Sequence, residues 1–213
     1  MNWFANTLGS SVGKKLMMAI TGFGFILFLI GHLIGNLTIY AGKDAFVAYA
    51  GHLHSLEPVI RAMEAGLILF AVVHILTGLI LFYQNFKARP DRYSVNNRAG
   101  GRTLGSATMP YTGLIILAFV IFHLFNFTFV DKTDRTIWDI VSASFSNPIY
   151  VFLYIASVFI VAVHVSHGFW SAFQTVGINH PKYMPSIQTL GLIFSLIVAI
   201  GFGFIPIFVA TIS

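Results

Sequence analysis

The chain has 213 residues, of which 57% are hydrophobic and 9% are charged, and its formal net charge is +5. A soluble domain usually carries charge on about 25% of its residues, so this composition excludes a water-soluble fold. A membrane-spanning helix needs about 20 apolar residues, which leaves room for four or five spans but not for a second catalytic domain. Because the chain contains no cysteine, disulfides, iron–sulfur clusters and thiol chemistry are excluded within it, whereas its eight histidines need an explanation.

Five long apolar runs follow one another, and they predict an all-α membrane protein with a single transmembrane domain over residues 1–213. We expect the five helices at about 16–40, 59–85, 108–130, 148–176 and 187–212. The first run is too long for the apolar part of a signal peptide and precedes no small-residue cleavage site, so it should stay as a helix. Asn147-Pro148 is typical of a helix start, and Pro206 predicts a kink in the last helix.

The distribution of lysine and arginine predicts the orientation of the chain. With the N-terminus on the cytoplasmic side, the cytoplasmic segments contain eight of these residues and the outer segments contain four. The most basic segment, residues 87–102 between the second and third helices, then faces the cytoplasm as well. The net charge of +5 follows from this asymmetry and does not indicate binding to nucleic acid.

Five of the eight histidines fall inside the expected helices, where an ionisable residue is costly. They are His32, His74, His123, His164 and His167. One such histidine could simply hydrogen-bond a neighbouring helix, but here four successive helices each carry at least one. The remaining three, His52, His54 and His180, are expected in loops or at interfaces as solvated side chains.

The position of each histidine along its helix predicts two pairs at two depths. Because successive helices run in opposite directions, His32 of the first helix and His123 of the third should lie in the outer half of the membrane. His74 of the second helix and His164 of the fourth should lie in the inner half. At about 1.5 Å per residue, this outer pair and this inner pair should be separated by very roughly 14 Å.

Small and hydroxyl residues repeat in register with the histidines. In the first and third helices, a threonine followed by glycine stands eleven residues before the histidine. In the second helix the same two residues stand just after the histidine. In the fourth helix His167 takes the place of the threonine. The repeat consists of Thr21-Gly22, Thr112-Gly113, Thr77-Gly78 and His167-Gly168. Glycine leaves room for a flat group beside the backbone, although close helix packing is an alternative reason for it. The repeat makes His164 the expected ligand and leaves His167 to hydrogen-bond a carbonyl, a propionate or a quinone.

Two imidazoles that face each other in a helical bundle are the axial ligands typical of a b-type haem. Zinc usually requires four ligands at one depth, and a proton-relay transporter usually shows acidic residues in mid-membrane. We therefore expect the first four helices to form a bundle that binds two haem b groups and conducts electrons across the membrane. A partner must then supply the chemistry on soluble substrates, since the chain has neither cysteine nor a dinucleotide-binding glycine pattern.

A polar group at the start of the second helix lies near the expected depth of the outer pair. It includes His54, Arg61 and Glu64. A carboxylate and a histidine beside a redox cofactor suit the proton exchange of quinone chemistry, which makes these residues candidate quinone contacts. An ordinary interfacial polar cluster is the alternative interpretation.

Taken together, these features resemble a known family, the dihaem cytochrome b subunit that anchors succinate dehydrogenase and fumarate reductase, the succinate:quinone oxidoreductases, in the membrane. The resemblance covers nearly the whole chain. It rests on the five helices, the histidines of the first four, the segment GGRTLGSATMPYTG that leads into the third helix and the segment HVSHGFWSAFQTVGI in the fourth.

The resemblance implies that His32 and His123 ligate the distal haem, and that His74 and His164 ligate the haem proximal to an iron–sulfur subunit. It also implies a flavoprotein subunit with covalent FAD, an iron–sulfur subunit on the cytoplasmic face, and menaquinone as the bound substrate. The chain would be the quinone-reactive subunit of this respiratory enzyme in the bacterial cytoplasmic (inner) membrane, with no dicarboxylate site of its own.

In one respect the chain departs from the family pattern. Some dihaem members carry an acidic residue just before the histidine of the fourth helix, whereas this chain has Ala162 and Val163 there, which removes the acid of that proton route. Two alternatives remain open. One is another cytochrome b with one histidine on each of four helices, such as the ascorbate-linked type, and the other is a haem-free transporter or structural anchor.

Overall fold

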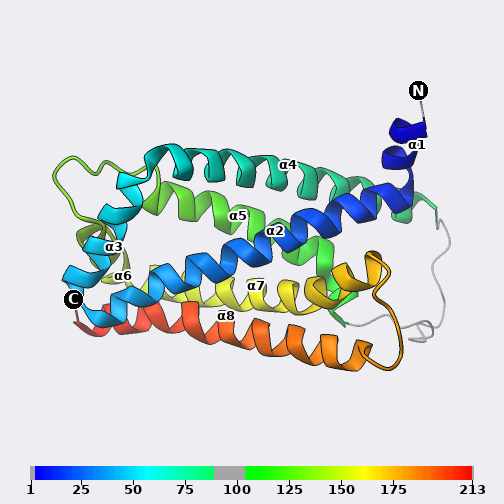
Figure 1. Cartoon of the computed structure of the whole chain (residues 1–213). Coiled ribbons are helices and arrows are strands. Elements are labelled where there is room, and N and C mark those ends of the chain that lie inside the picture. The colour runs from blue at the N-terminus through cyan, green and yellow to red at the C-terminus, as the bar shows by residue number, and fades with distance from the viewer. Residues whose placement is uncertain (1–2, 89–103, 213) are drawn as a thin grey trace.

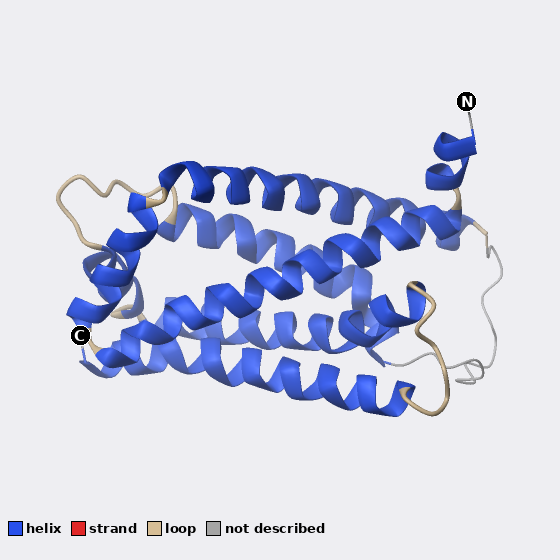
Figure 2. Ribbon diagram, in the orientation of Figure 1, coloured by secondary structure: helices blue, strands red, loops and turns tan. Residues whose placement is uncertain are grey.

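A computed structural model describes residues 3–88 and 104–212, and every element of secondary structure in these residues is helical (Figures 1 and 2). Five of the helices are long and apolar enough to cross a membrane, which confirms the expected all-α class. They are α2 (Ser11–Leu37), α4 (Glu57–Lys87), α5 (Leu104–Phe127), α7 (Pro148–Thr175) and α8 (Met184–Ile212).

The long helices begin and end within a few residues of the expected positions. Helix α4 begins at Glu57 rather than Val59, because Pro58 fits the first turn, where its missing N–H is not needed. The start of α7 is as expected, since the Asn147 side chain accepts a hydrogen bond of 2.9 Å from the Ile149 N–H and Pro148 is the first helical residue. Helix α8 continues through Pro206.

Three shorter helices lie where the sequence was expected to form loops or terminal segments. They are α1 (Trp3–Gly9), α3 (Lys43–Ser55) and α6 (Ile137–Phe145). A 3₁₀ helix, η1 (Thr38–Ala41), extends α2, and Gly42 then turns the chain into α3 with a φ of 100°, which favours glycine. His52 and His54 therefore lie on a helix, and both are exposed.

The five long helices run side by side, with α2 crossing the others obliquely (Figure 1). Helix α8 packs along α7, α2 packs on both α4 and α7, and α5 packs on α7. The chain enters α2 and α5 at one end of the bundle, which we call the inner end after the orientation expected from the sequence. Helices α3 and α6 and the C-terminus lie at the opposite, outer end (Figure 1).

The tightest packing lies at the outer end. Buried side chains from α3, α6, α7, α8 and η1 form one cluster there, which we call the outer cluster: Ile39, Phe46, Val141, Phe145, Tyr154, Ile205 and Val209. In contrast, large apolar side chains such as Leu27, Ile68 and Ile200 are exposed along the helices. Such surfaces suit lipid rather than water, in agreement with helices that cross a membrane.

Candidate functional site

The structure brings together the two histidine pairs that the sequence predicts. The ring centres of His32 on α2 and His123 on α5 are 5.9 Å apart, with an angle of 87° between the rings. The ring centres of His74 on α4 and His164 on α7 are 6.5 Å apart, with an angle of 59°. All four side chains are half-buried. Each pair therefore joins imidazoles from two different helices inside the bundle.

The two pairs lie at different levels of the bundle. The Thr21 hydroxyl is 3.0 Å from Nδ1 of His74, so Thr21 marks the level of the inner pair on α2. His32, on the same helix, is eleven residues further along the chain. At about 1.5 Å per residue, the two levels are about 16 Å apart along α2.

The hydrogen bonds of Thr21 favour one tautomer of His74. The Thr21 hydroxyl uses its single proton on the carbonyl oxygens of Met17 at 2.8 Å and Met18 at 3.1 Å. With that proton used in this way, its oxygen accepts from His74, an arrangement that corresponds to the tautomer with the ring proton on Nδ1. The other nitrogen, Nε2, keeps its lone pair and is available to a metal ion.

His164 is held in the same way from α5. The Thr112 hydroxyl donates to the carbonyl oxygens of Thr108 and Met109, both at 3.1 Å, and lies 3.0 Å from Nδ1 of His164. The adjacent glycines also match, because Gly22 lies beside Cε1 of His74 and Gly113 beside Cε1 of His164. The two Thr-Gly motifs thus have one structural role in common, which is to hold the histidines of the inner pair.

The outer pair has no equivalent hydroxyl partner among the described residues. Nδ1 of His123 is buried, and within the described part of the chain nothing hydrogen-bonds to it. The Asn36 amide lies 3.5 Å from Nδ1 of His32, at the limit of a hydrogen bond, and donates at 2.8 Å to the His32 carbonyl oxygen. A buried imidazole nitrogen without a partner is costly, so this position favours an additional bound group.

Aromatic rings surround the outer pair, and sequence reasoning missed them. Phe28 stacks on His32 with ring centres 5.1 Å apart, and Phe202 of α8 lies 5.4 Å from the same ring. Tyr154 lies 6.0 Å from His123 and accepts a hydrogen bond of 3.1 Å from the Asn126 amide. The sequence does contain one signal, since phenylalanine stands four residues before the histidine in α2, α4 and α5.

Of the other residues expected to contact a cofactor, some pack against neighbouring side chains or helices in the structure. Thr77 is buried and donates to the carbonyl oxygens of Val73 and His74 within α4. Gly78 faces the sulfur of Met18, whereas the space beside Gly168 is open. His167 lies edge-on to Trp170, with ring centres 4.7 Å apart, and its Cβ packs against Gly105 of α5. Close packing of two helices thus occurs at Gly105, which is not one of the glycines of the repeat.

The candidate quinone contacts lie at the outer end of α4 and on α3. Arg61 forms ion pairs with Glu57 at 3.6 Å and with Glu64 at 3.3 Å, and the Glu64 side chain is 46% exposed. Nδ1 of His54 hydrogen-bonds at 2.8 Å to the Ala50 carbonyl within α3. The structure thus joins Arg61 to Glu64, and it gives His54 a partner on its own helix.

The separation of the ring centres in both pairs can be compared with that of two imidazoles bound to one metal ion. Two imidazoles that bind a metal through bonds of about 2.0 Å have their ring centres roughly 6 Å apart, close to both measured separations. No group of three or more histidine, aspartate or glutamate side chains that could hold a metal ion is found in residues 3–88 and 104–212. Each level thus has two histidine side chains close together, from two different helices.

The chain matches no family model, no curated protein and no solved structure.

Proposed function

We propose that the chain is a dihaem cytochrome b and acts as the membrane anchor of a succinate:quinone oxidoreductase. In this role it carries electrons between an iron–sulfur subunit and a membrane quinone. The observation that supports the proposal most strongly is the presence of two facing histidine pairs on four helices, with 5.9 Å and 6.5 Å between ring centres. Two imidazoles at each level match the axial ligand set of a b-type haem.

Two features of the inner pair suit a b-type haem, namely the distance between the two rings and the hydrogen bonds to their Nδ1 atoms. In the proposed site, the Thr21 and Thr112 hydroxyls, each 3.0 Å from Nδ1 of His74 or His164, accept from that nitrogen, and Nε2 of each ring is then free to bind iron. In the outer pair, Nδ1 of His123 is buried and has no hydrogen-bond partner among the described residues, so a bound group at this site would satisfy it. Haem iron, when bound, supplies one-electron transfer.

The chain's own residues hold the ligands and exclude water. The outer cluster and the aromatic rings around His32 and His123 separate the outer pair from the aqueous phase. Such burial tunes the potential of a bound haem. The threonine hydroxyls fix the inner rings and adjust the basicity of their nitrogens.

The two ends of the electron path take different partners in this proposal. The iron–sulfur subunit, which works with a flavoprotein that contains FAD, docks on the inner, cytoplasmic end. Near the outer pair, a quinone such as menaquinone accepts two electrons and two protons to form the quinol, or the reverse. His54, Arg61 and Glu64 are the proposed quinone contacts, with Glu64 as the carboxylate that exchanges a proton. The membrane is then the bacterial cytoplasmic membrane.

Haem content of the purified chain tests this proposal. We expect two low-spin haem b groups per chain in a reduced-minus-oxidised spectrum and in quantitative haem extraction. His164→Ala should remove one of the two, because it deletes an axial nitrogen of the inner pair. His167→Ala is the matched control on the same helix and should retain both.

Absence of haem from the purified wild-type chain, or loss of haem in both variants alike, contradicts the dihaem assignment. The identity of the complex is tested separately, by purification from the native membrane under mild conditions. Co-purification of a flavoprotein and an iron–sulfur protein supports the succinate:quinone oxidoreductase role. Two haems without these partners favour the alternative of an ascorbate-linked cytochrome b.

A further inference from the structure

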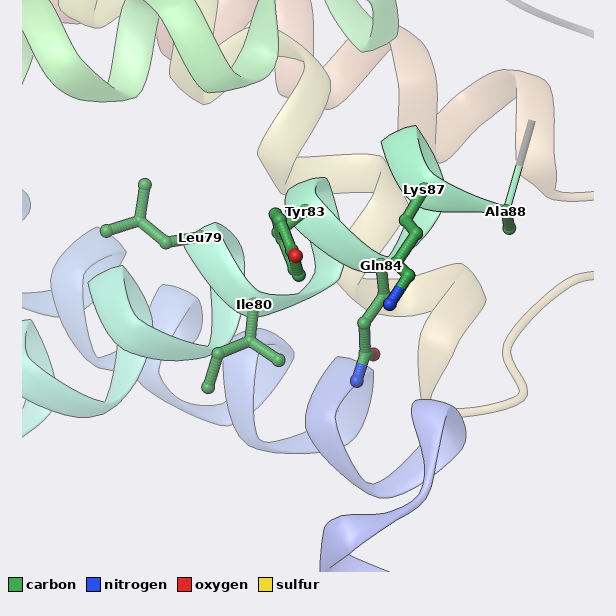
Figure 3. A pocket seen from close by; sticks show the side chains of 6 residues that line it. All are labelled: Leu79, Ile80, Tyr83, Gln84, Lys87 and Ala88. Atoms are coloured by element: carbon green, nitrogen blue, oxygen red, sulfur yellow. The ribbon is translucent and has the colours of Figure 1, made fainter. Parts of the chain in front are cut away.

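A groove lies along the inner end of α4, outside the histidine pairs. It has a volume of about 660 Å³ and is lined by Leu79, Ile80, Tyr83, Gln84, Lys87 and Ala88 (Figure 3). The side chains of Gln84 and Lys87 reach to the same side of α4, toward α2 (Figure 3). None of these residues takes part in the proposed electron path.

The chemistry of the groove changes along the helix axis. Ile80, Gln84 and Lys87 stand at the spacing that places residues on one face of a helix. The deep part of the groove is apolar, at Leu79 and Ile80, and its polar part includes the ammonium group of Lys87, the last residue of α4. A phospholipid has the same order of chemistry, with an apolar acyl chain at one end and a charged phosphate at the other.

A second lysine reaches the polar part of the groove from α2. Nζ of Lys14 donates to Oε1 of Gln84 at 3.4 Å. An ammonium group has three donors, so Lys14 can bind an anion while it contacts Gln84. Gln84 thus stands between two cationic side chains from different helices.

The inner end offers these lysines no carboxylate among the described residues. The three ion pairs found in residues 3–88 and 104–212 all belong to the outer half of the molecule, at Lys43–Asp139, Arg61–Glu57 and Arg61–Glu64. Every aspartate and glutamate in those residues lies in the same half. Among the described residues these two lysines thus have no acidic partner, and anionic lipid, in which the cytoplasmic leaflet is rich, carries the complementary charge.

We propose that this groove binds one anionic phospholipid of the inner leaflet. The phosphate lies between Lys14 and Lys87 and hydrogen-bonds to both, and an acyl chain lies against Leu79 and Ile80. Lipid binding at this position requires the chain to be embedded in a membrane but does not require haem, so it stands or fails independently of the proposed function.

Native mass spectrometry of the full chain tests the site. The chain is released from nanodiscs that contain equal amounts of phosphatidylglycerol and phosphatidylcholine with identical acyl chains. We expect the wild type to retain phosphatidylglycerol preferentially. In the Lys14→Gln/Lys87→Gln variant, the ratio of bound phosphatidylglycerol to phosphatidylcholine should fall severalfold, because both ammonium groups that contact the phosphate are removed.

Two comparisons make the test specific to the groove. Lys15→Gln/Lys182→Gln removes the same charge from the same end and should keep the wild-type ratio. Ile80→Trp fills the apolar part of the groove while both lysines remain, and should lower the amount of bound phosphatidylglycerol severalfold. The proposal is overturned if the wild type shows no preference, if the control pair lowers the ratio as much as the groove pair, or if Ile80→Trp binds lipid like the wild type.

Discussion

The Thr21 hydroxyl forms hydrogen bonds in two directions. It donates to the carbonyl oxygen of Met17 in its own helix and accepts from His74 in another. An ordinary helical threonine, such as Thr175, forms only the first kind of bond among the described residues. The difference matters because a buried imidazole has two possible tautomers, and only one of them leaves Nε2 free. Thr21 and Thr112 are therefore positioning residues for the inner pair.

Removing either hydroxyl should weaken the cofactor site without abolishing it. Thr21→Val and Thr112→Val keep the size of the side chain but leave Nδ1–H of the facing histidine without its acceptor. We expect haem affinity at the inner pair to fall roughly 10- to 100-fold, the usual effect of losing such a partner. Haem titration of the apoprotein, followed by absorbance, measures the two sites.

Thr175→Val is the matched control for these variants, since this threonine also bonds to its own helix but lies at the end of α7. It should bind both haems as the wild type does. If the Thr21 and Thr112 variants titrate like Thr175→Val, the hydroxyls have no role in holding the ligands.

At the scale of elements, helices α3 and α6 close the outer end of the bundle. Lys43 at the start of α3 forms an ion pair of 3.4 Å with Asp139 in the first turn of α6. Asp139 also completes the capping box of α6, because it accepts from the Thr136 N–H and hydroxyl at 2.9 Å and 2.6 Å. One carboxylate thus caps α6 and links it to α3.

The capping box predicts how Asp139 titrates. The hydrogen bonds from the Thr136 hydroxyl and N–H, with a smaller contribution from Lys43, hold the pKa of Asp139 below its ordinary value. Because the pKa is lower in the folded state, the cap stabilises α6 above the ordinary pKa of about 3.9 and is lost as the pH falls through the folded value. Thr136→Ala should raise the pKa of Asp139 toward its ordinary value, as measured by ¹³C NMR of the carboxyl group.

A nearby threonine provides the control for this titration. Thr133 donates from its N–H and hydroxyl to Asp131, and these bonds, led by the hydroxyl, lower the pKa of Asp131. Thr133→Ala should therefore raise the pKa of Asp131 and leave that of Asp139 unchanged. A shift of both carboxyl groups in either variant means that the outer loop unfolds as a whole and that the capping box does not act locally.

Hydropathy predicts the long helices because each must supply about 20 apolar residues to cross the membrane. The same criterion overlooks α6, which has only nine residues, although Thr136 and Asp139 before an apolar run are typical of a capped helix start. The pairing of the histidines was predictable from depth alone. The bond between Thr21 and His74 was not, because it also depends on how each helix is rotated about its axis.

The contacts of α8 could not be predicted from the sequence at all. Phe202 lies against His32, although the pattern of α8 contains no histidine and no repeat of the Thr-Gly motif. Its position depends on the packing of α8 along α7 and against α2, which is a property of the tertiary structure. Sequence reasoning therefore identified the histidines and the threonines but not the aromatic residues around them.

At the scale of the whole molecule, the acidic residues that the structure describes are confined to one half, and the other end carries only basic ones. The described residues of the inner end include Lys14, Lys15, Lys87 and Lys182, whereas the described acidic residues all lie in the outer half. The basic residues expected between 89 and 102 lie outside the described residues. This distribution agrees with a cytoplasmic inner end under the positive-inside rule.

The lack of cysteine allows this orientation to be measured without background labelling. Ser10→Cys places a thiol at the inner end, and Lys132→Cys places one in the exposed loop at the outer end. In intact cells, a membrane-impermeant maleimide should label Lys132→Cys at once and Ser10→Cys only after permeabilisation. The reverse pattern contradicts the orientation, and the wild-type chain, which should not react, is the control.

The matched bonds from Thr21 to His74 and from Thr112 to His164 relate α2 and α4 to α5 and α7. Exchanging these two helical hairpins replaces His32 by His123 and His74 by His164, as a twofold axis along the membrane normal would. In this pattern each pair consists of a residue and its counterpart on the other hairpin, but the packing is only partly symmetric, because α2 packs extensively on α7 whereas α4 and α5 make few contacts. A single hairpin supplies only one histidine to each level, so both levels need both hairpins, and α8, which packs along α7, contributes no histidine to either.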